Sequence, residues 1–268
     1  MSILFNADDD QIKVTLSSAL TIGTTSDYVV SFWVYYTSLP ANLGLTMALL
    51  DVDPSGSGRR IMWTDDGSAI YADEDDGGIG SYTVSATTGY FVVFQRTTTT
   101  DLLRIFPDSS STTPLNGGGS GDTATDTADL SALDTVIFGD INPSARVAMR
   151  MEAISLKIQT GISGGWSDSE CRTESTKYAI QKAGGTERLA WRLSSATADT
   201  NGYYEIGGSG PNFSGTGGTI TTGSWYPSQL ESLVTTYQHS GTDGAKLSDA
   251  LSYNVRPSPS TCRIVSVL

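Results

Sequence analysis

Short runs of β-branched and aromatic residues, separated by turns rich in Gly, Asp, Ser and Thr, recur along most of the chain. The strongest run, Asp27–Tyr36, would place Phe32 on one face of a strand and Trp33 on the other. A strand with large side chains on both faces belongs in the middle of a sheet rather than at its edge. We therefore predict a central strand over 27–36, with Trp33 largely buried.

Further runs follow at intervals of roughly 8 to 15 residues, a spacing typical of β-sandwiches. They predict strands at 3–5, 12–16, 45–52, 59–64, 69–72, 82–85, 89–96, 102–106, 135–139, 148–159, 189–193, 203–206, 219–222 and 262–268. The Ser/Thr/Gly-rich stretch 109–127 and the glycines of 215–218 predict a loop and a flexible turn. The pattern as a whole predicts an all-β protein, a two-sheet antiparallel β-sandwich.

Two stretches carry helical signals. Ser167 and Glu170 have the spacing of a capping box, in which each side chain satisfies a backbone N–H at a helix start. The predicted helix runs to about Lys182 and stops at Gly184–Gly185. A second short helix is predicted behind Pro227, from the helical spacing of Leu230, Leu233, Val234 and Tyr237.

The last part of the chain differs from the rest in pattern. We predict a sandwich over 1–223 and a C-terminal extension over 224–268, made of the short helix, a Pro-containing extended tail and a terminal strand. Terminal residues fray unless something holds them, and a short apolar strand can add to an exposed sheet edge of a partner. The alternative is that the terminal strand pairs within its own sandwich. The candidate docking residues are Tyr253, Arg256, Pro257, Ile264, Val265, Val267 and Leu268.

Composition limits the partners. The net charge is −13, and the 16 Lys and Arg residues form no basic cluster, which argues against nucleic acid as a partner. No apolar run approaches the ~20 residues of a membrane span, and the first residues lack the basic and apolar regions of a signal peptide. Cys171 and Cys262 have no metal or redox spacing, and a disulfide between them stays open.

Three groups of residues are candidates for chemistry. We expect no cofactor, and the acidic run Asp73, Glu74, Asp75 and Asp76 is expected to be solvated turn residues; the alternative is that it supplies oxygen ligands for Ca²⁺. Trp63, Tyr71 and Tyr82 could form a sugar-stacking platform, or could pack as core and cross-strand residues. His239 is the only histidine, and we expect it to be an exposed loop residue rather than the base of a serine-hydrolase triad.

The order of these elements resembles a known superfamily. Leu4 to Val14, then Val30-Ser31-Phe32-Trp33-Val34, are similar to the opening strands of laminin G-like jelly rolls of the concanavalin A-like lectin/glucanase superfamily. Further similar motifs are Tyr90–Val93, Leu103–Asp108, Phe138-Gly139, Met151–Leu156 and the start of the helix at Trp166–Glu170. The resemblance covers about residues 3–183, and it departs from the pattern at Ser109 and Tyr90. It implies a two-sheet jelly roll.

The resemblance also bears on catalysis. Glucanases of this superfamily carry Glu-x-Asp-x-x-Glu on one strand, because retaining hydrolysis needs two carboxyl groups about 5 Å apart. The corresponding strand here holds Glu152 alone, with Ile154 and Lys157 where acidic residues would stand. We therefore expect no catalytic residues and no enzymatic activity.

These observations favour a non-enzymatic structural or adhesion protein on the exterior of an assembly. A phage virion protein fits best, either a capsid decoration (cement) protein or an appendage component that contacts other virion proteins or copies of itself. The Thr/Ser/Gly-rich composition without a signal peptide supports a location on the virion exterior. The alternative is a glycan-binding lectin, with or without Ca²⁺, that is extracellular, on a cell surface or on a phage fibre. A third reading is an unusual glycoside hydrolase.

Overall fold

The structure, a computed structural model, describes residues 2–6, 10–23, 25–39, 43–50, 60–66, 69–74, 77–125, 130–139, 147–148, 150–193, 203–205, 214–217 and 220–230, some of them by their backbone only. Residues 1–230 form one compact unit and residues 231–268 a second. The whole second unit lies outside the described residues. The predicted division at 223/224 stays a prediction.

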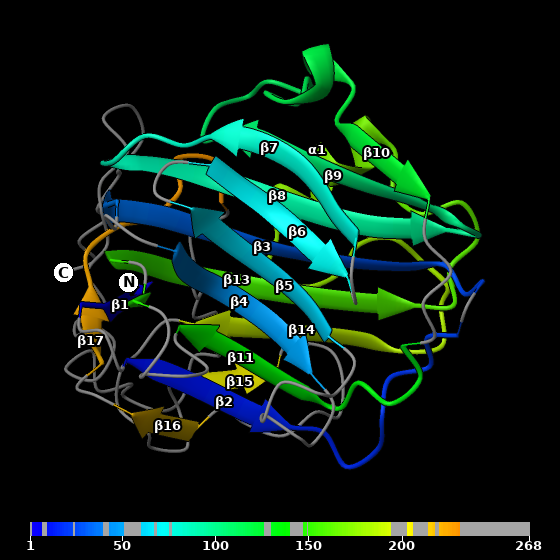
Figure 1. The fold of residues 1–268 in the computed structure, drawn as a ribbon, viewed down its shortest axis with the longest axis horizontal. Coiled ribbons are helices and arrows are strands. Elements are labelled where there is room, and N and C mark those ends of the chain that lie inside the picture. Colours follow the sequence, from blue (N-terminus) through cyan, green and yellow to red (C-terminus); the bar gives the residue numbers. More distant parts are fainter. Residues whose placement is uncertain are drawn as a thin grey trace, which may run out of the picture. The chain divides into compact units, whose positions relative to one another are not determined.

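Within the described residues, nine strands form the larger sheet (Figure 1). Its neighbours follow the order β10 (Asp122–Thr125), β9 (Thr100–Pro107), β8 (Thr88–Thr97), β3 (Tyr28–Ser38), β13 (Arg150–Thr160), β1 (Ser2–Phe5) and β17 (Thr221–Gly223). Beyond this path, β14 (Arg188–Leu193) pairs with β13 and with β15 (Tyr203–Glu205). All these pairings are antiparallel, and β3 lies between β8 and β13. The prediction of a central strand is confirmed.

The second sheet has eight described strands. Its order is β16 (Ser214–Gly217), β2 (Gln11–Thr15), β11 (Thr135–Gly139), β4 (Leu43–Leu50), β5 (Arg60–Asp66), β6 (Ala69–Glu74) and β7 (Gly77–Thr83), and β12 (Val147–Ala148) pairs with β4. In Figure 1 this sheet lies in front of the larger one. Apart from the parallel β12–β4 pair, its described pairings are antiparallel. The two-sheet antiparallel sandwich is confirmed.

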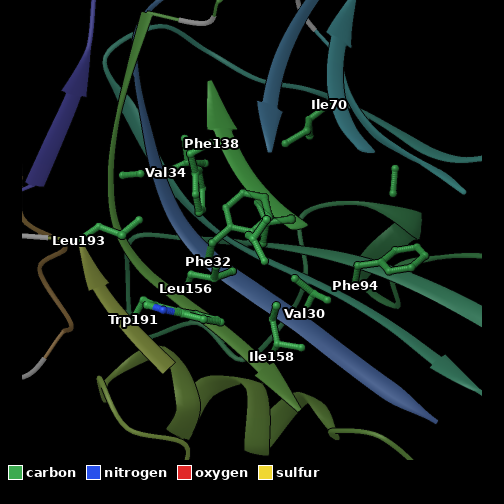
Figure 2. Packing of buried hydrophobic residues seen from close by; sticks show 14 of the residues in the cluster. Val30, Phe32, Val34, Ile70, Phe94, Phe138, Leu156, Ile158, Trp191 and Leu193 are labelled. Atoms are coloured by element: carbon green, nitrogen blue, oxygen red, sulfur yellow. The ribbon is translucent and has the colours of Figure 1, made fainter. Parts of the chain in front are cut away.

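The main core lies between the two sheets (Figure 2). From the larger sheet, Val30 and Phe32 of β3 point into it, and the Phe32 ring meets that of Phe138 from β11 edge-on at 5.7 Å. Removal of such a side chain from water contributes ~1.5–3 kcal/mol. Figure 2 labels further members of this core, namely Val34, Ile70, Phe94, Leu156, Ile158, Trp191 and Leu193.

A second apolar layer covers the other face of the larger sheet. Trp33 of β3 and Phe91 of β8 pack there against Trp166 and Cys171, which come from the segment around α1 (Asp168–Ser175). Trp33 is 1% exposed, so its predicted burial is confirmed. The large side chains of β3 are thus buried on both faces of the larger sheet, as the run 27–36 predicts.

Several boundaries differ from the predictions. The predicted strand 82–85 is placed too late, since β7 spans Gly77–Thr83, and the predicted loop 109–127 contains β10 and a 3-10 turn, η1 (Gly117–Gly119). The predicted turn at 215–218 contains most of β16. Helix α1 ends at Ser175 rather than near Lys182, because the N–H groups of Gln181 and Lys182 donate to the Glu174 carboxylate instead of continuing a helix.

Candidate functional site

The three predicted platform residues lie on three successive strands. Trp63 on β5 pairs with Ala72 on β6, and Tyr71 on β6 pairs with Thr64 on β5. The side chains of Trp63 and Tyr71 lie outside those described. Tyr82 on β7 is partly buried against the main core, with its ring 5.9 Å from that of Tyr90. Burial raises the pKa of the Tyr82 phenol. Sugar stacking by these residues stays a prediction.

The predicted calcium ligands lie mostly outside the description. Asp73 and Glu74 belong to the end of β6 by their backbone, whereas Asp75 and Asp76 lie outside the described residues. Among the side chains that are described, no group of three or more His, Cys, Asp or Glu could hold a metal ion. A Ca²⁺ site at 73–76 therefore stays a prediction.

The predictions for the end of the chain also lie outside the described residues. They comprise the docking residues Tyr253–Leu268, His239 and Cys262. Of the predicted second helix only Pro227–Leu230 is described, and it forms a turn in which the Leu230 N–H donates to the Pro227 carbonyl over 3.3 Å. Cys171 is a free, buried thiol.

The described side chains form a different candidate site on the outer face of the larger sheet, at the end of β3. Tyr35 pairs across the strands with Glu152 of β13 on one side and with Gly89 of β8 on the other. Trp225, from the segment that follows β17, stacks on Tyr35 with 5.2 Å between ring centroids and 24° between planes. We call Tyr35, Glu152 and Trp225 the aromatic–carboxylate site.

Trp225 is positioned by contacts on three sides. Its backbone N–H donates to Glu152 Oε2 over 2.6 Å, and its ring meets Trp33 edge-on at 6.0 Å. The ring lies over Gly89, where a Cβ atom would come within 2.4 Å of Trp225 Cζ2. Glycine at position 89 therefore leaves the space that the indole occupies.

The segment 224–230 is held at its far end as well. The Ser228 N–H donates to Asp108 Oδ1 over 2.7 Å, and the Gln229 side chain accepts from Arg172 of α1 over 2.6 Å. Leu230 is buried in the second apolar layer. Fixed at both ends, this segment holds the Trp225 ring in one place.

Glu152 is the polar centre of the site. It is 6% exposed, and its Oε2 accepts hydrogen bonds from the Ser2 hydroxyl and the Trp225 N–H. Gly223 leaves room for this carboxylate, because a Cβ atom there would meet Glu152 Oε2 at 2.3 Å. Glu152 Oε1 accepts no hydrogen bond from any residue that the structure describes. The carboxylate is therefore fixed through one oxygen and has the other available.

The two aromatic side chains also have available polar atoms. Neither Trp225 Nε1 nor the Tyr35 hydroxyl is hydrogen-bonded to a described residue, and both side chains are partly exposed. The site thus combines flat aromatic surface, one N–H donor, one hydroxyl and one carboxylate acceptor. Such a set matches a ligand that has both C–H faces and hydroxyl groups.

The sequence signals for this site were incomplete. Tyr35 belongs to the predicted central strand, and Glu152 was noted only as a carboxylate without a catalytic partner. Trp225 follows the predicted strand 219–222, and nothing local in the sequence brings it next to Tyr35. The available signal was the aromatic pair Trp225-Tyr226 shortly after a predicted strand.

Charged residues elsewhere on this face are paired beneath α1. Lys157 donates to Glu174 over 2.8 Å, with both side chains 1% exposed. Arg104 donates to Asp168 over 2.8 Å and to the Trp166 carbonyl over 2.8 Å. These contacts attach α1 and the preceding segment to the sheet.

The comparisons with known proteins concern the fold. No protein-family model matches this sequence, and no curated protein is similar to it. A protein from Bacteroides ovatus, provisionally described as carbohydrate binding, matches 85% of this chain and 61% of its own with a TM-score of 0.51 at 7% identity. Domains LG4-5 of the mouse laminin α1 chain match 59% of this chain and 40% of theirs, with a TM-score of 0.40 at 11% identity.

The fold is that of the concanavalin A-like, laminin G-like jelly rolls. The resemblance noted in the sequence is confirmed at this level. The jelly roll spans less than two thirds of the length of either matched chain. No helix in the described part of it is long and apolar enough to span a membrane. The predicted virion location and the capsid or appendage partners stay predictions.

The prediction that the chain is not an enzyme is corrected. Matched structures include a sialidase from Trypanosoma rangeli, with a TM-score of 0.38 at 13% identity over 56% of this chain and 22% of the sialidase, and also alginate lyases. A lone Glu152 on β13 excludes only a mechanism with two carboxylates on one strand. Catalytic groups can also come together from different strands and loops, so the missing motif does not exclude activity.

Proposed function

We propose that this jelly roll is a carbohydrate-binding protein and that the aromatic–carboxylate site holds the sugar. One observation carries the proposal: the nearly buried Glu152 has an oxygen without a hydrogen bond to any described residue, beside the stacked rings of Tyr35 and Trp225. Glu152 Oε1 is not among the described buried atoms that lack a partner, so solvent reaches this oxygen. A sugar hydroxyl could therefore take the place of water and donate to a charged acceptor, which forms stronger hydrogen bonds than a neutral one.

The aromatic pair fits the apolar face of a sugar ring. One face of a pyranose ring is lined by C–H groups, which pack on flat aromatic surface, whereas its hydroxyls need partners at the edge. Trp225 Nε1 and the Tyr35 hydroxyl supply such partners next to that surface. The Bacteroides ovatus protein of the same fold, described as carbohydrate binding, supports this choice of ligand.

A glycan array followed by calorimetric titration tests the proposal. We expect binding to at least one glycan, and Trp225→Ala should weaken it about tenfold or more through loss of stacking, equivalent to ~1.4 kcal/mol. Gly89→Ala keeps every site residue but pushes the indole away, and it should weaken binding similarly. The matched control is Gly23→Ala, where the new Cβ would meet only Ser26 Oγ at 3.4 Å.

Variants of the predicted sugar-stacking residues Trp63 and Tyr71 provide a second test. If Trp63→Ala and Tyr71→Ala abolish binding while Trp225→Ala and Gly89→Ala leave it unchanged, the sugar binds elsewhere on the jelly roll and our assignment of the site is wrong. An array without any bound glycan would contradict the proposed function itself.

A further inference from the structure

Glu152 gives the proposed site a defined charge. Cross-strand pairing places it beside Tyr35, so its carboxylate lies at the edge of the stacked rings. It forms no ion pair with any residue that the structure describes, since its hydrogen bonds come from the Ser2 hydroxyl and a backbone N–H. The negative charge of the site is therefore not neutralised by a described neighbour.

The ion pairs given for the described cations lie elsewhere. Arg96 pairs with Asp101, Arg104 with Asp168, Lys157 with Glu174 and Lys182 with Glu170, and Arg172 donates to Gln229 and Ser175. None of these ion pairs involves a residue of the aromatic–carboxylate site. A ligand carboxylate or sulfate would thus meet an acceptor and a like charge in place of a guanidinium or ammonium group.

The available polar atoms favour hydroxyl groups instead. A hydroxyl donates to Glu152 Oε1 and accepts from Trp225 Nε1, whereas a carboxylate can only accept. Hydrogen bonds to a charged acceptor are about twice as strong as neutral ones, so a donating hydroxyl gains most at this position. At longer range the net charge of −13 also disfavours polyanionic chains.

We infer that the aromatic–carboxylate site selects neutral, hydroxyl-rich sugars and rejects uronic, sialic and sulfated ones. This inference rests on the proposed carbohydrate-binding function and specifies its ligand class. Glu152 acts in it as a specificity-determining residue, and the rings of Tyr35 and Trp225 act as the surface that both kinds of sugar would share.

Matched probes that differ only at C6 test the inference. We would titrate the full chain with oligosaccharides of glucose, mannose and galactose and with their uronate counterparts, in which the C6 alcohol is a carboxylate. The neutral member of a bound pair should bind at least about tenfold more tightly, the scale of repulsion between like charges at a partly exposed site. Added salt should narrow the gap, because it screens that repulsion.

Variants separate the charge of Glu152 from its structural role. Glu152→Gln keeps an acceptor for Ser2 and the Trp225 N–H while removing the charge, so it should weaken the neutral sugar about fivefold and strengthen the uronate. Arg188→Gln on β14 is the matched control and should change neither affinity, because the Arg188 guanidinium donates to the Ile180 carbonyl. Arg150→Gln, two residues before Glu152 on β13, tests whether a cation contributes to uronate binding. The melting temperature of each variant shows whether the fold is retained. Gln95→Glu serves as a second control, because it changes a charge in the buried layer away from the site.

The outcomes distinguish this inference from the function on which it rests. If the uronate binds as tightly as the neutral sugar, the inferred selectivity is wrong. If that binding is also lost in Trp225→Ala, the assignment of the site still holds. Uronate binding that depends on Arg150 likewise overturns the inferred selectivity. If no member of any pair binds, both the selectivity and the proposed function are wrong.

Discussion

Trp33 shows how single residues join the layers of this jelly roll. Its ring packs on Phe91 with 5.2 Å between centroids and meets Trp225 edge-on, so the second apolar layer and the proposed site share one side chain. Its indole N–H donates to the Ser175 carbonyl over 2.8 Å, at the end of α1. The residue therefore links the central strand to the helix and to the site.

Truncation of this side chain should be costly. We expect Trp33→Ala to lower the free energy of unfolding by ~3–5 kcal/mol, through lost burial and the cavity left behind. Trp33→Phe keeps an aromatic ring but loses the bond to Ser175, worth about 1 kcal/mol. Denaturant unfolding measures both, with Leu115→Ala as the control because Leu115 is 39% exposed. An unchanged stability of Trp33→Ala would contradict the burial of this residue.

Cys171 gives a second prediction for a single residue. Burial raises the pKa of its thiol to about 12, so almost no reactive thiolate exists near neutral pH. In a Cys262→Ser variant, a thiol reagent at pH 8 should label the folded chain negligibly and the guanidinium-unfolded chain once. Rapid labelling of the folded variant would show that Cys171 is accessible.

At the scale of elements, α1 is short and depends on its end contacts. Ser167 and Glu170 form the capping box that the sequence predicts, and Glu170 also accepts from Lys182 over 2.8 Å. Lys182 lies beyond the helix, so the helix start is joined to the segment that follows its end. Because the Glu170 carboxyl is ionisable, these contacts depend on pH.

The Glu170 contacts predict a specific acid response. The hydrogen bond from Lys182, followed by that from Ser167, lowers the pKa of Glu170 from 4.5 to about 2. A lowered folded-state pKa stabilises the fold above the unfolded-state value, and this contribution is lost as pH falls from about 4.5 to about 2. Across that pH window, the melting temperature of Glu170→Gln should therefore fall less than that of the unmodified protein. An equal loss in both would contradict the assignment.

The sequence predicted those elements well whose formation depends on residues close together in the chain. The two-sided runs that became β3 and β8 identify themselves by large side chains on both faces. β10 and β16 were missed because Thr, Ser and Gly dominate them, and only pairing with β9 and β2 makes them strands. The helix end was missed for the same kind of reason, since Glu174 ends the regular hydrogen bonding through its side chain. Trp225 reaches Tyr35 only through the register of distant strands, which no local pattern encodes.

At the scale of the whole chain, residues 1–230 form one compact unit, which holds both sheets and both described apolar layers. The segment 224–230 belongs to this unit through its contacts with Glu152, Asp108 and Arg172. The segment that carries Trp225 is therefore part of the unit 1–230 and not of the unit 231–268.

The last prediction follows from this division and concerns the tail. Deletion of 254–268 should leave the melting temperature nearly unchanged, because residues 231–268 form a unit of their own, apart from the compact unit 1–230. Deletion of 221–268 is the matched comparison, and it should lower the melting temperature because it removes β17, Trp225 and Leu230. Calorimetry measures both. A stable shorter deletion that no longer joins its assembly would support docking of Ile264–Leu268 on a partner. If instead the shorter deletion unfolds the chain, the terminal strand pairs within its own sandwich and the docking hypothesis is wrong.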